Sequence, residues 1–161
     1  MSWDFFYIFE VQIKLNMKKT LLLSILSFLF VTLTYSQTYN IEGDWYSENK
    51  DAIIKIYKVG NTLSGKITWI KNPNDKNGNP KTDPENPNEK LKSRKRLGMI
   101  MMYDFTYDGD NEWDDGEIYD PESGNTYSGI ITMTSKNKLD LRGYVGISWF
   151  GRTSQWTRKI N

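Results

Sequence analysis

The sequence predicts an all-β protein, a single eight-stranded antiparallel barrel that follows an N-terminal signal peptide. Apolar and polar residues alternate with a period of two through most of residues 41–159, which is typical of strands with one buried face. Short turn sequences rich in Gly, Asn and Asp separate the alternating segments. Eight antiparallel strands can close into a barrel and remove the sheet edges. An open β-sandwich is the main alternative.

Residues 1–36 are predicted to be a signal peptide region, in which the upstream start at Met1 is mis-assigned. The basic pair Lys18-Lys19 comes directly before the apolar stretch Thr20–Leu33. This stretch is shorter than the ~20 residues that a membrane-spanning helix needs. Small side chains occupy the positions that a signal peptidase reads, so we expect cleavage between Ser36 and Gln37.

The leader predicts export to the periplasm or the extracellular space, with residues 37–161 as one β-barrel domain. Because the leader is complete from Met17, we expect translation to start there and not at Met1. The chain has no cysteine, which excludes a lipid anchor and a disulfide. No stable membrane anchor is therefore expected after cleavage.

Composition excludes several classes of function. The chain has 21 basic and 20 acidic residues, and the two signs balance once residues 1–36 are set aside, so no binding to nucleic acid is expected. It has no histidine, which removes the commonest metal ligand and the commonest general base. We therefore predict no metal site, no cofactor and no conventional hydrolase triad.

The first three predicted strands form a meander. They cover Ile41–Trp45, Asp51–Val59 and Thr62–Ile70, and Gly60-Asn61 supplies a tight hairpin turn between the second and the third. Apolar side chains alternate with polar ones in each of them, so each strand is expected to bury one face.

A long loop is predicted over Lys71–Arg96. It holds four of the five prolines and almost no large apolar side chain, with a short helical turn expected near Asn88–Ser93. Loops of this length are usually functional or disordered. Two interpretations remain open: a mobile, solvated excursion, and a lid over the mouth of the barrel.

Five further strands complete the predicted barrel. In the first of them, which begins at Leu97, Met99, Met101, Tyr103 and Phe105 are expected to share one face. The others cover Trp113–Tyr119, Thr126–Thr134, Leu139–Val145 and Arg152–Lys159.

Several motifs of the chain occur together in one known family. They are Gly43-Asp44-Trp45, Leu63 to Ile67, Asp83 to Pro87, Arg96-Leu97-Gly98, Trp113 to Pro121, Gly124 to Tyr127, Leu141 to Tyr144, Gly151 to Thr153 and Trp156 to Arg158. In this combination the chain resembles an uncharacterised family of exported bacterial proteins, domain of unknown function 2147. The resemblance implies a lipocalin-like, calycin-type barrel with an export signal, and it implies no activity.

Four residues are predicted to close the barrel. In barrels of the lipocalin type, the Trp of a Gly-x-Trp sequence plugs one end and an Arg near the last strand stacks on it. Gly43 and Trp45 here match the first feature, and Trp156 and Arg158 match the second. A stacked guanidinium contributes about 0.5–2 kcal/mol.

A set of apolar residues of equal parity is predicted to face the interior: Ile67, Trp69, Met99, Met101, Tyr103, Phe105, Tyr127, Ile131 and Met133. This set is either plain core or core that also lines a cavity. Methionines and aromatics suit an adaptable apolar pocket. We predict an exported, non-enzymatic barrel that binds a small apolar or amphipathic ligand, with the Lys71–Arg96 loop as its gate. The candidate pocket residues are Trp69, Met101, Tyr103, Tyr127 and Ile131.

Two alternative functions remain open. One is an interaction module with a filled core that contacts an envelope protein or a glycan through Trp149 and Phe150. The other is a glycan hydrolase that uses two carboxylates, for which Asp115 and Glu117 would share one face of a strand.

The nearby acidic residues do not form a calcium loop of the EF-hand type. Trp113 stands at the position that such a loop reserves for glycine.

Overall fold

The structure is a computed structural model that describes residues 7, 10–20 and 38–160. The chain divides into two units, residues 1–37 and 38–161. In the first unit, residues 10–20 are helical. The predicted cleavage site at Ser36 and most of the predicted apolar stretch lie outside the described residues. No helix in the described ranges combines the length and the apolar character that crossing a bilayer requires.

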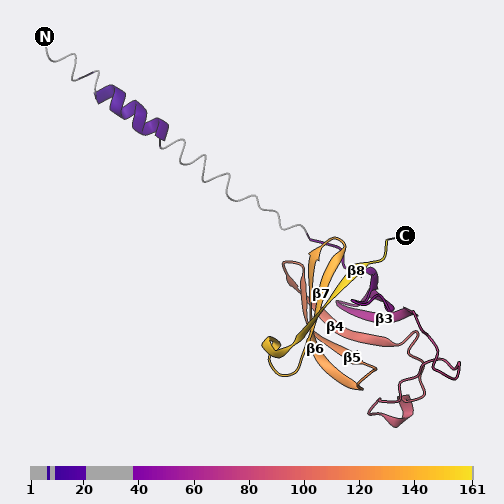
Figure 1. Ribbon diagram of the computed structural model, residues 1–161. Helices are drawn as coiled ribbons and strands as arrows, with labels where there is room; N and C mark the ends of the chain where they lie inside the picture. Colours follow the sequence, from indigo (N-terminus) through magenta and orange to yellow (C-terminus); the bar gives the residue numbers. More distant parts are fainter. Residues whose placement is uncertain (1–6, 8–9, 21–37, 161) are drawn as a thin grey trace. The chain divides into compact units, whose positions relative to one another are not determined.

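Residues 38–160 contain a closed barrel of eight antiparallel strands, which confirms the predicted fold class (Figure 1). Each strand pairs with the next along the chain, and β8 returns to β1. The strands are β1 Gly43–Tyr46, β2 Ala52–Val59, β3 Thr62–Ile70, β4 Ile100–Gly109, β5 Glu112–Asp120, β6 Asn125–Ser135, β7 Lys138–Tyr144 and β8 Arg152–Arg158. Two short 3-10 helices, η1 Glu89–Leu91 and η2 Ser148–Phe150, lie in the connections.

The two ends of the barrel carry different connections. At one end, called the closed end, lie the tight turns between β2 and β3, β4 and β5, and β6 and β7. Positive φ angles at Gly60 and at Asp110-Asn111 allow the first two of these turns. At the other end, called the open end, lie four connections: residues 47–51, 71–99, 121–124 and 145–151.

The predicted alternation in β4 is wrong at its centre, because an extra residue interrupts it. Leu63 of β3 pairs with Phe105 and Gly65 pairs with Met102, so β4 advances by three residues where β3 advances by two. Asp104 takes a φ of 58° at this bulge. Met102 and Phe105 are therefore buried in the main core, whereas Met101 and Tyr103 are only partly buried.

β5 contains a matching irregularity. Between Trp113 and Gly116 it advances by one residue more than β6, and Asp115 there takes a φ of 55°. The Phe105 ring occupies the space that this arrangement leaves. A Cβ on Gly116 would lie 2.3 Å from that ring and a Cβ on Gly129 would lie 2.6 Å from it. Glycine at these two positions lets the aromatic ring fill the middle of the barrel.

Trp45 and Arg158 pack the closed end. The Trp45 side chain is fully buried, and its Nε1 donates to the Ile41 carbonyl oxygen at 2.9 Å. The Arg158 guanidinium lies 4.2 Å from the centre of the indole. It also donates to the carbonyl oxygens of Glu42 and Lys136, each at 2.9 Å. One side chain thus joins the indole, the segment before β1 and the turn before β7.

Trp45→Ala is expected to lower the free energy of unfolding by about 3–5 kcal/mol, because it removes a buried indole and leaves a cavity beneath Arg158. Urea denaturation followed by far-UV circular dichroism measures the change. Trp149→Ala is the matched control, since Trp149 is 88% exposed and its removal should change stability by no more than about 0.5 kcal/mol. A loss below about 1 kcal/mol for Trp45→Ala would show that the indole does not hold the barrel end together.

Candidate functional site

The interior of the barrel is not filled at the open end. A cavity of about 620 Å³ lies there, within the usual size range of small-molecule sites. Ends of β4, β5, β6, β7 and β8 contribute to its wall, together with the connection before β2. The site is therefore built from positions that are far apart in the sequence and adjacent around the rim.

The cavity wall contains both apolar and charged side chains. The apolar and aromatic side chains are Met101, Ile118, Tyr127, Tyr144, Val145 and Phe150. The charged side chains are Glu48, Asp51, Asp120 and Arg152, and Ser47, Asn49 and Ser154 add polar groups. Such a wall matches a ligand that has an apolar body and a polar end.

Hydrogen bonds hold the rim carboxylates in place. Ser47 Oγ donates to Asp51 Oδ1 at 2.6 Å. Asp120 Oδ1 accepts from the Glu122 backbone N–H at 2.9 Å, and its Oδ2 accepts from Ser123 Oγ at 2.7 Å. Both carboxylates are thus positioned by their own turns before any ligand is present.

A second cavity of about 370 Å³ adjoins the first at the open end. The two share Ser47, Asp51, Met101, Asp120 and Ser154 in their walls. The second cavity reaches apolar side chains of β2, β3 and β8, and on its outer side it meets Lys81 and Arg96. Met101, Asp51 and Asp120 therefore stand at the junction of the two spaces.

The five predicted pocket residues do not form one group. Met101 and Tyr127 line the larger cavity. Ile131 is fully buried in the main core, and Trp69 is 41% exposed. Tyr103 lies apart from both cavities, where its hydroxyl donates to the Ile100 carbonyl oxygen at 2.6 Å. The bulge at Asp104 changes the parity of β4, so a rule of strict alternation cannot select the lining of this strand.

Sequence reasoning missed most of the polar part of the site. Asp51 and Asp120 lie at strand ends, where charged residues usually mark solvated turns, and the chain gives no local indication that they meet. Asp120 lies within one of the family motifs, Trp113 to Pro121, and this position in a motif was the signal that could have indicated a site residue. Asp115 and Glu117, the predicted hydrolytic pair, are exposed and do not line either cavity at the open end.

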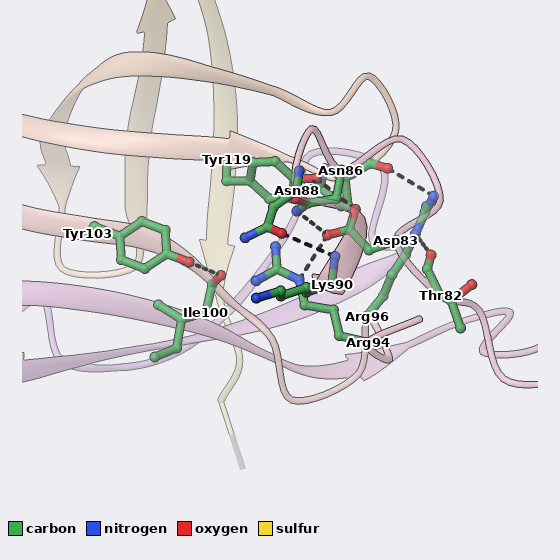
Figure 2. Close-up of polar contacts among 11 residues, drawn as sticks. Thr82, Asp83, Asn86, Asn88, Lys90, Arg94, Arg96, Ile100, Tyr103 and Tyr119 are labelled. Atoms are coloured by element: carbon green, nitrogen blue, oxygen red, sulfur yellow. Dashed lines mark hydrogen bonds and ion pairs between the residues drawn. The ribbon is translucent and has the colours of Figure 1, made fainter. Parts of the chain in front are cut away.

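The β3–β4 connection, residues 71–99, is bound to the barrel by a buried carboxylate (Figure 2). Asp83 is fully buried, and Tyr119 Oη of β5 donates to its Oδ1 at 2.7 Å. Asn86 Nδ2 and Arg94 Nε each donate to Oδ2 at 2.8 Å. The Arg94 guanidinium also lies over the Tyr119 ring, 5.1 Å from its centre. Three residues of the connection, Asp83, Asn86 and Arg94, thus all contact Tyr119 of β5.

This network determines the protonation of its members. Burial acts to raise the pKa of Asp83, but the hydrogen bonds from Tyr119, Asn86 and Arg94 and the charge of Arg94 outweigh it, and the pKa lies below its ordinary value. Burial and the hydrogen bond to Asp83 raise the pKa of Tyr119. The folded state therefore favours a charged Asp83 and a neutral Tyr119.

Arg96 gives the connection a second attachment. Its Nε donates to the Thr82 carbonyl oxygen at 2.7 Å (Figure 2). Its guanidinium donates to the Pro121 carbonyl oxygen at 2.9 Å and pairs with Glu122. The sequence predicted either a mobile excursion or a lid here. The structure shows a connection with two polar anchors and one 3-10 helix, η1, at the place where a helical turn was expected.

The β7–β8 loop, residues 145–151, carries exposed apolar side chains on the other side of the cavity. Val145, Ile147, Trp149 and Phe150 are all more than half exposed. Arg142 holds the loop by donating from Nε to the Ser148 carbonyl oxygen at 2.7 Å, and from the guanidinium to the Trp149 carbonyl oxygen at 3.2 Å. The loop backbone is thus attached to Arg142 through two main-chain oxygens, while its large side chains face solvent.

Comparisons with known proteins agree with this architecture. The model of a protein family described as "Uncharacterized protein conserved in bacteria (DUF2147)" matches residues 43–158. The chain matches no curated protein significantly. Among solved structures it is similar to one described as "Protein HP1028 from the human pathogen Helicobacter pylori belongs to the lipocalin family". The likeness has 19% identity and a TM-score of 0.69, and it covers 77% of this chain and 86% of that one. At this identity the likeness shows the fold alone, a lipocalin-like barrel.

Asp83→Asn is expected to lower the free energy of unfolding at pH 7 by about 1.5–3 kcal/mol, since it removes the charge that Arg94 and Tyr119 are arranged to meet. The folded-state pKa of Asp83 is depressed, so its contribution is complete above the unfolded pKa of about 3.9 and is lost as the pH falls through the folded value. Urea denaturation from pH 7 to pH 3 should show the difference between variant and wild type shrinking below about pH 4.

Asp140→Asn is the control for this series, because Asp140 lies in β7, distant in sequence from the Asp83 network and not among its partners. It should leave the wild-type pH dependence unchanged. A difference between Asp83→Asn and wild type that stays constant down to pH 3 would show that the charge of Asp83 does not stabilise the fold.

Proposed function

Because the chain belongs to the DUF2147 family of uncharacterised bacterial proteins and folds as a lipocalin-like barrel, we propose that it is a non-enzymatic protein that binds a small amphipathic molecule at the open end. The observation that carries this proposal is the cavity of about 620 Å³, whose wall combines apolar and charged side chains.

The distribution of the core supports a binding role. The main core, with Trp45, Phe105 and Leu139 among its fully buried members, fills the barrel toward the closed end and the middle. Toward the open end the side chains leave the two adjoining cavities, and Ile118 belongs both to the main core and to the wall of the larger one. Met101, Ile118 and Tyr127 are the apolar contacts that the ligand would meet.

The lack of histidine and cysteine supports a role without chemistry. The sequence has neither histidine nor cysteine, and the acidic pair proposed for hydrolysis lies outside the cavity lining. The β3–β4 connection contributes Lys81 and Arg96 to the wall of the smaller cavity. Since the β3–β4 connection is anchored at Asp83, we propose that it forms a stationary part of the cavity wall. The movable part of the entrance would then be a different segment.

We also propose that the protein is exported, with residues 1–36 as a leader that is removed and residues 37–161 as the barrel domain. The basic pair Lys18-Lys19, the apolar stretch Thr20–Leu33 and the small residues before Gln37 support this proposal. A periplasmic or extracellular barrel would meet its ligand outside the cytoplasm.

Native mass spectrometry of the protein, purified from the producing cell without a denaturing step, is expected to show an extra mass that leaves on unfolding. Gly143→Leu should abolish this mass, because residue 143 lines the cavity and a leucine there occupies the ligand space. Gly143→Ala is the matched control: a Cβ at this position meets Ile118 and Tyr127 at 3.6 Å, an ordinary contact, so the ligand should be retained. A protein that carries no extra mass and binds no amphiphile afterwards would contradict the proposal.

A second candidate function, contact with an envelope protein or a glycan, is favoured by the exposed side chains of the β7–β8 loop. Trp149 and Phe150 are 88% and 84% exposed, and large aromatics that are fully exposed on a fixed backbone are frequent anchors of interfaces. This function does not require the cavity.

If the loop is such an interface, the double variant Trp149→Ala/Phe150→Ala should reduce crosslinking of the protein to its partner in the producing cell by about tenfold or more, the effect of losing an anchor residue. Its stability should be unchanged, and the single variant Trp149→Ala, whose residue does not line either cavity, should also keep the carried ligand. Trp69→Ala is the control for an exposed Trp elsewhere on the barrel and should keep the crosslinked product. Equal crosslinking in both variants would exclude the loop as the contact.

A further inference from the structure

We propose that the ligand of the larger cavity carries a cationic, amine-type head group on an apolar tail. This inference rests on the proposed binding function and adds the sign of the charge that the site selects.

The charges that line the larger cavity do not balance. Its wall contains three carboxylates, on Glu48, Asp51 and Asp120, and one guanidinium, on Arg152. Arg152 pairs with Glu48, with a distance of 3.3 Å between the guanidinium nitrogen and the carboxylate oxygen. Among the described residues, Asp51 and Asp120 form no ion pair. Two carboxylates are thus left for a charge that the ligand brings.

The adjoining cavity does not cancel this surplus. Of its two basic residues, Arg96 is paired with Glu122 and bound to the Pro121 carbonyl oxygen. Lys81 lies on the wall of the smaller cavity and does not line the larger one. Its ammonium is not within ion-pair distance of Asp51 or Asp120. In the larger cavity, the two carboxylates without an ion pair therefore face lining groups that are neutral or already paired, and the single charge of Lys81 in the smaller cavity offsets at most one of them.

The aromatic side chains complete the match to a cation. Tyr127, Tyr144 and Phe150 line the same cavity, and aromatic ring faces attract ammonium groups. Met101, Ile118 and Val145 offer an apolar surface for a tail. An anionic head group would meet two free carboxylates and an arginine that is already paired, so the same site disfavours it.

The test uses three probes with the same alkyl tail: decyltrimethylammonium, decyl maltoside and decyl sulfate. Any carried ligand is first removed by unfolding and refolding the protein, whose mass and far-UV circular dichroism then show that it is free of ligand and folded. The dissociation constant of each probe is measured by isothermal titration calorimetry below micelle formation. The cationic probe is expected to bind at least ~10-fold more tightly than either of the others, and its advantage should fall as salt is added. Equal affinity for all three would overturn the cation assignment and leave the binding function standing. Binding of none would overturn the binding function itself.

Variants that neutralise single carboxylates show which residues bind the cationic head group. Asp51→Asn and Asp120→Asn should each weaken the cationic probe by ~10-fold and leave the affinity for decyl maltoside unchanged, which also shows that the variants are folded. Asp140→Asn, a carboxylate of β7 that does not line either cavity, is the matched control and should bind all probes as the wild type does. If neither rim variant changes the affinity for the cationic probe, the assignment of Asp51 and Asp120 as its partners is wrong.

Discussion

The stacking of Arg158 on Trp45 is the contact on which the barrel depends most, because it lies at the weakest seam of the sheet. β1 and β8 are joined by only two paired positions, Trp45 with Arg158 and Tyr46 with Thr157, whereas the other strand pairs run longer. The guanidinium adds contacts to the indole and to carbonyl oxygens on both sides of this seam. Without that seam the sheet would have two free edges, which expose unpaired backbone groups. Closure at one end thus rests on one pair of side chains.

The bulges in β4 and β5 affect how far the free volume at the open end extends into the barrel. The extra residues in β4 and β5 bring Phe105 against Gly116 and Gly129, where no side chain competes for the space. The ring then fills the middle of the barrel, and the residues beyond it toward the open end, Met101 and Ile118, face free volume. Ile118 lies beside Gly129, as the Phe105 ring does, and it also lines the larger cavity, so it connects the core to the site.

The strands could be predicted from the sequence because alternation and turn residues are local signals. The predicted and observed limits of Thr62–Ile70 agree, as does the helical turn at η1. The lining of the cavity could not be predicted in the same way. A bulge at Asp104, with an aspartate at positive φ, is invisible in the pattern, and it turns Tyr103 away from the face that Phe105 occupies. The Asp83 network was equally hidden, since it joins a hydrophilic loop to Tyr119, a residue 36 positions later in the chain.

The β3–β4 connection and the β7–β8 loop flank the open end, and they are held by different forces. Moving the β3–β4 connection away from β5 would break the hydrogen bonds of Asp83 and Asn86 with Tyr119 and would expose the buried pair of Asp83 with Arg94. The β7–β8 loop is attached by hydrogen bonds from Arg142 to main-chain oxygens and presents Trp149 to solvent. Phe150 belongs both to this loop and to the cavity wall, so a shift of the loop widens the entrance without separating a buried ion pair. The energetic difference between the two attachments favours the β7–β8 side as the route by which an amphipathic molecule reaches the interior.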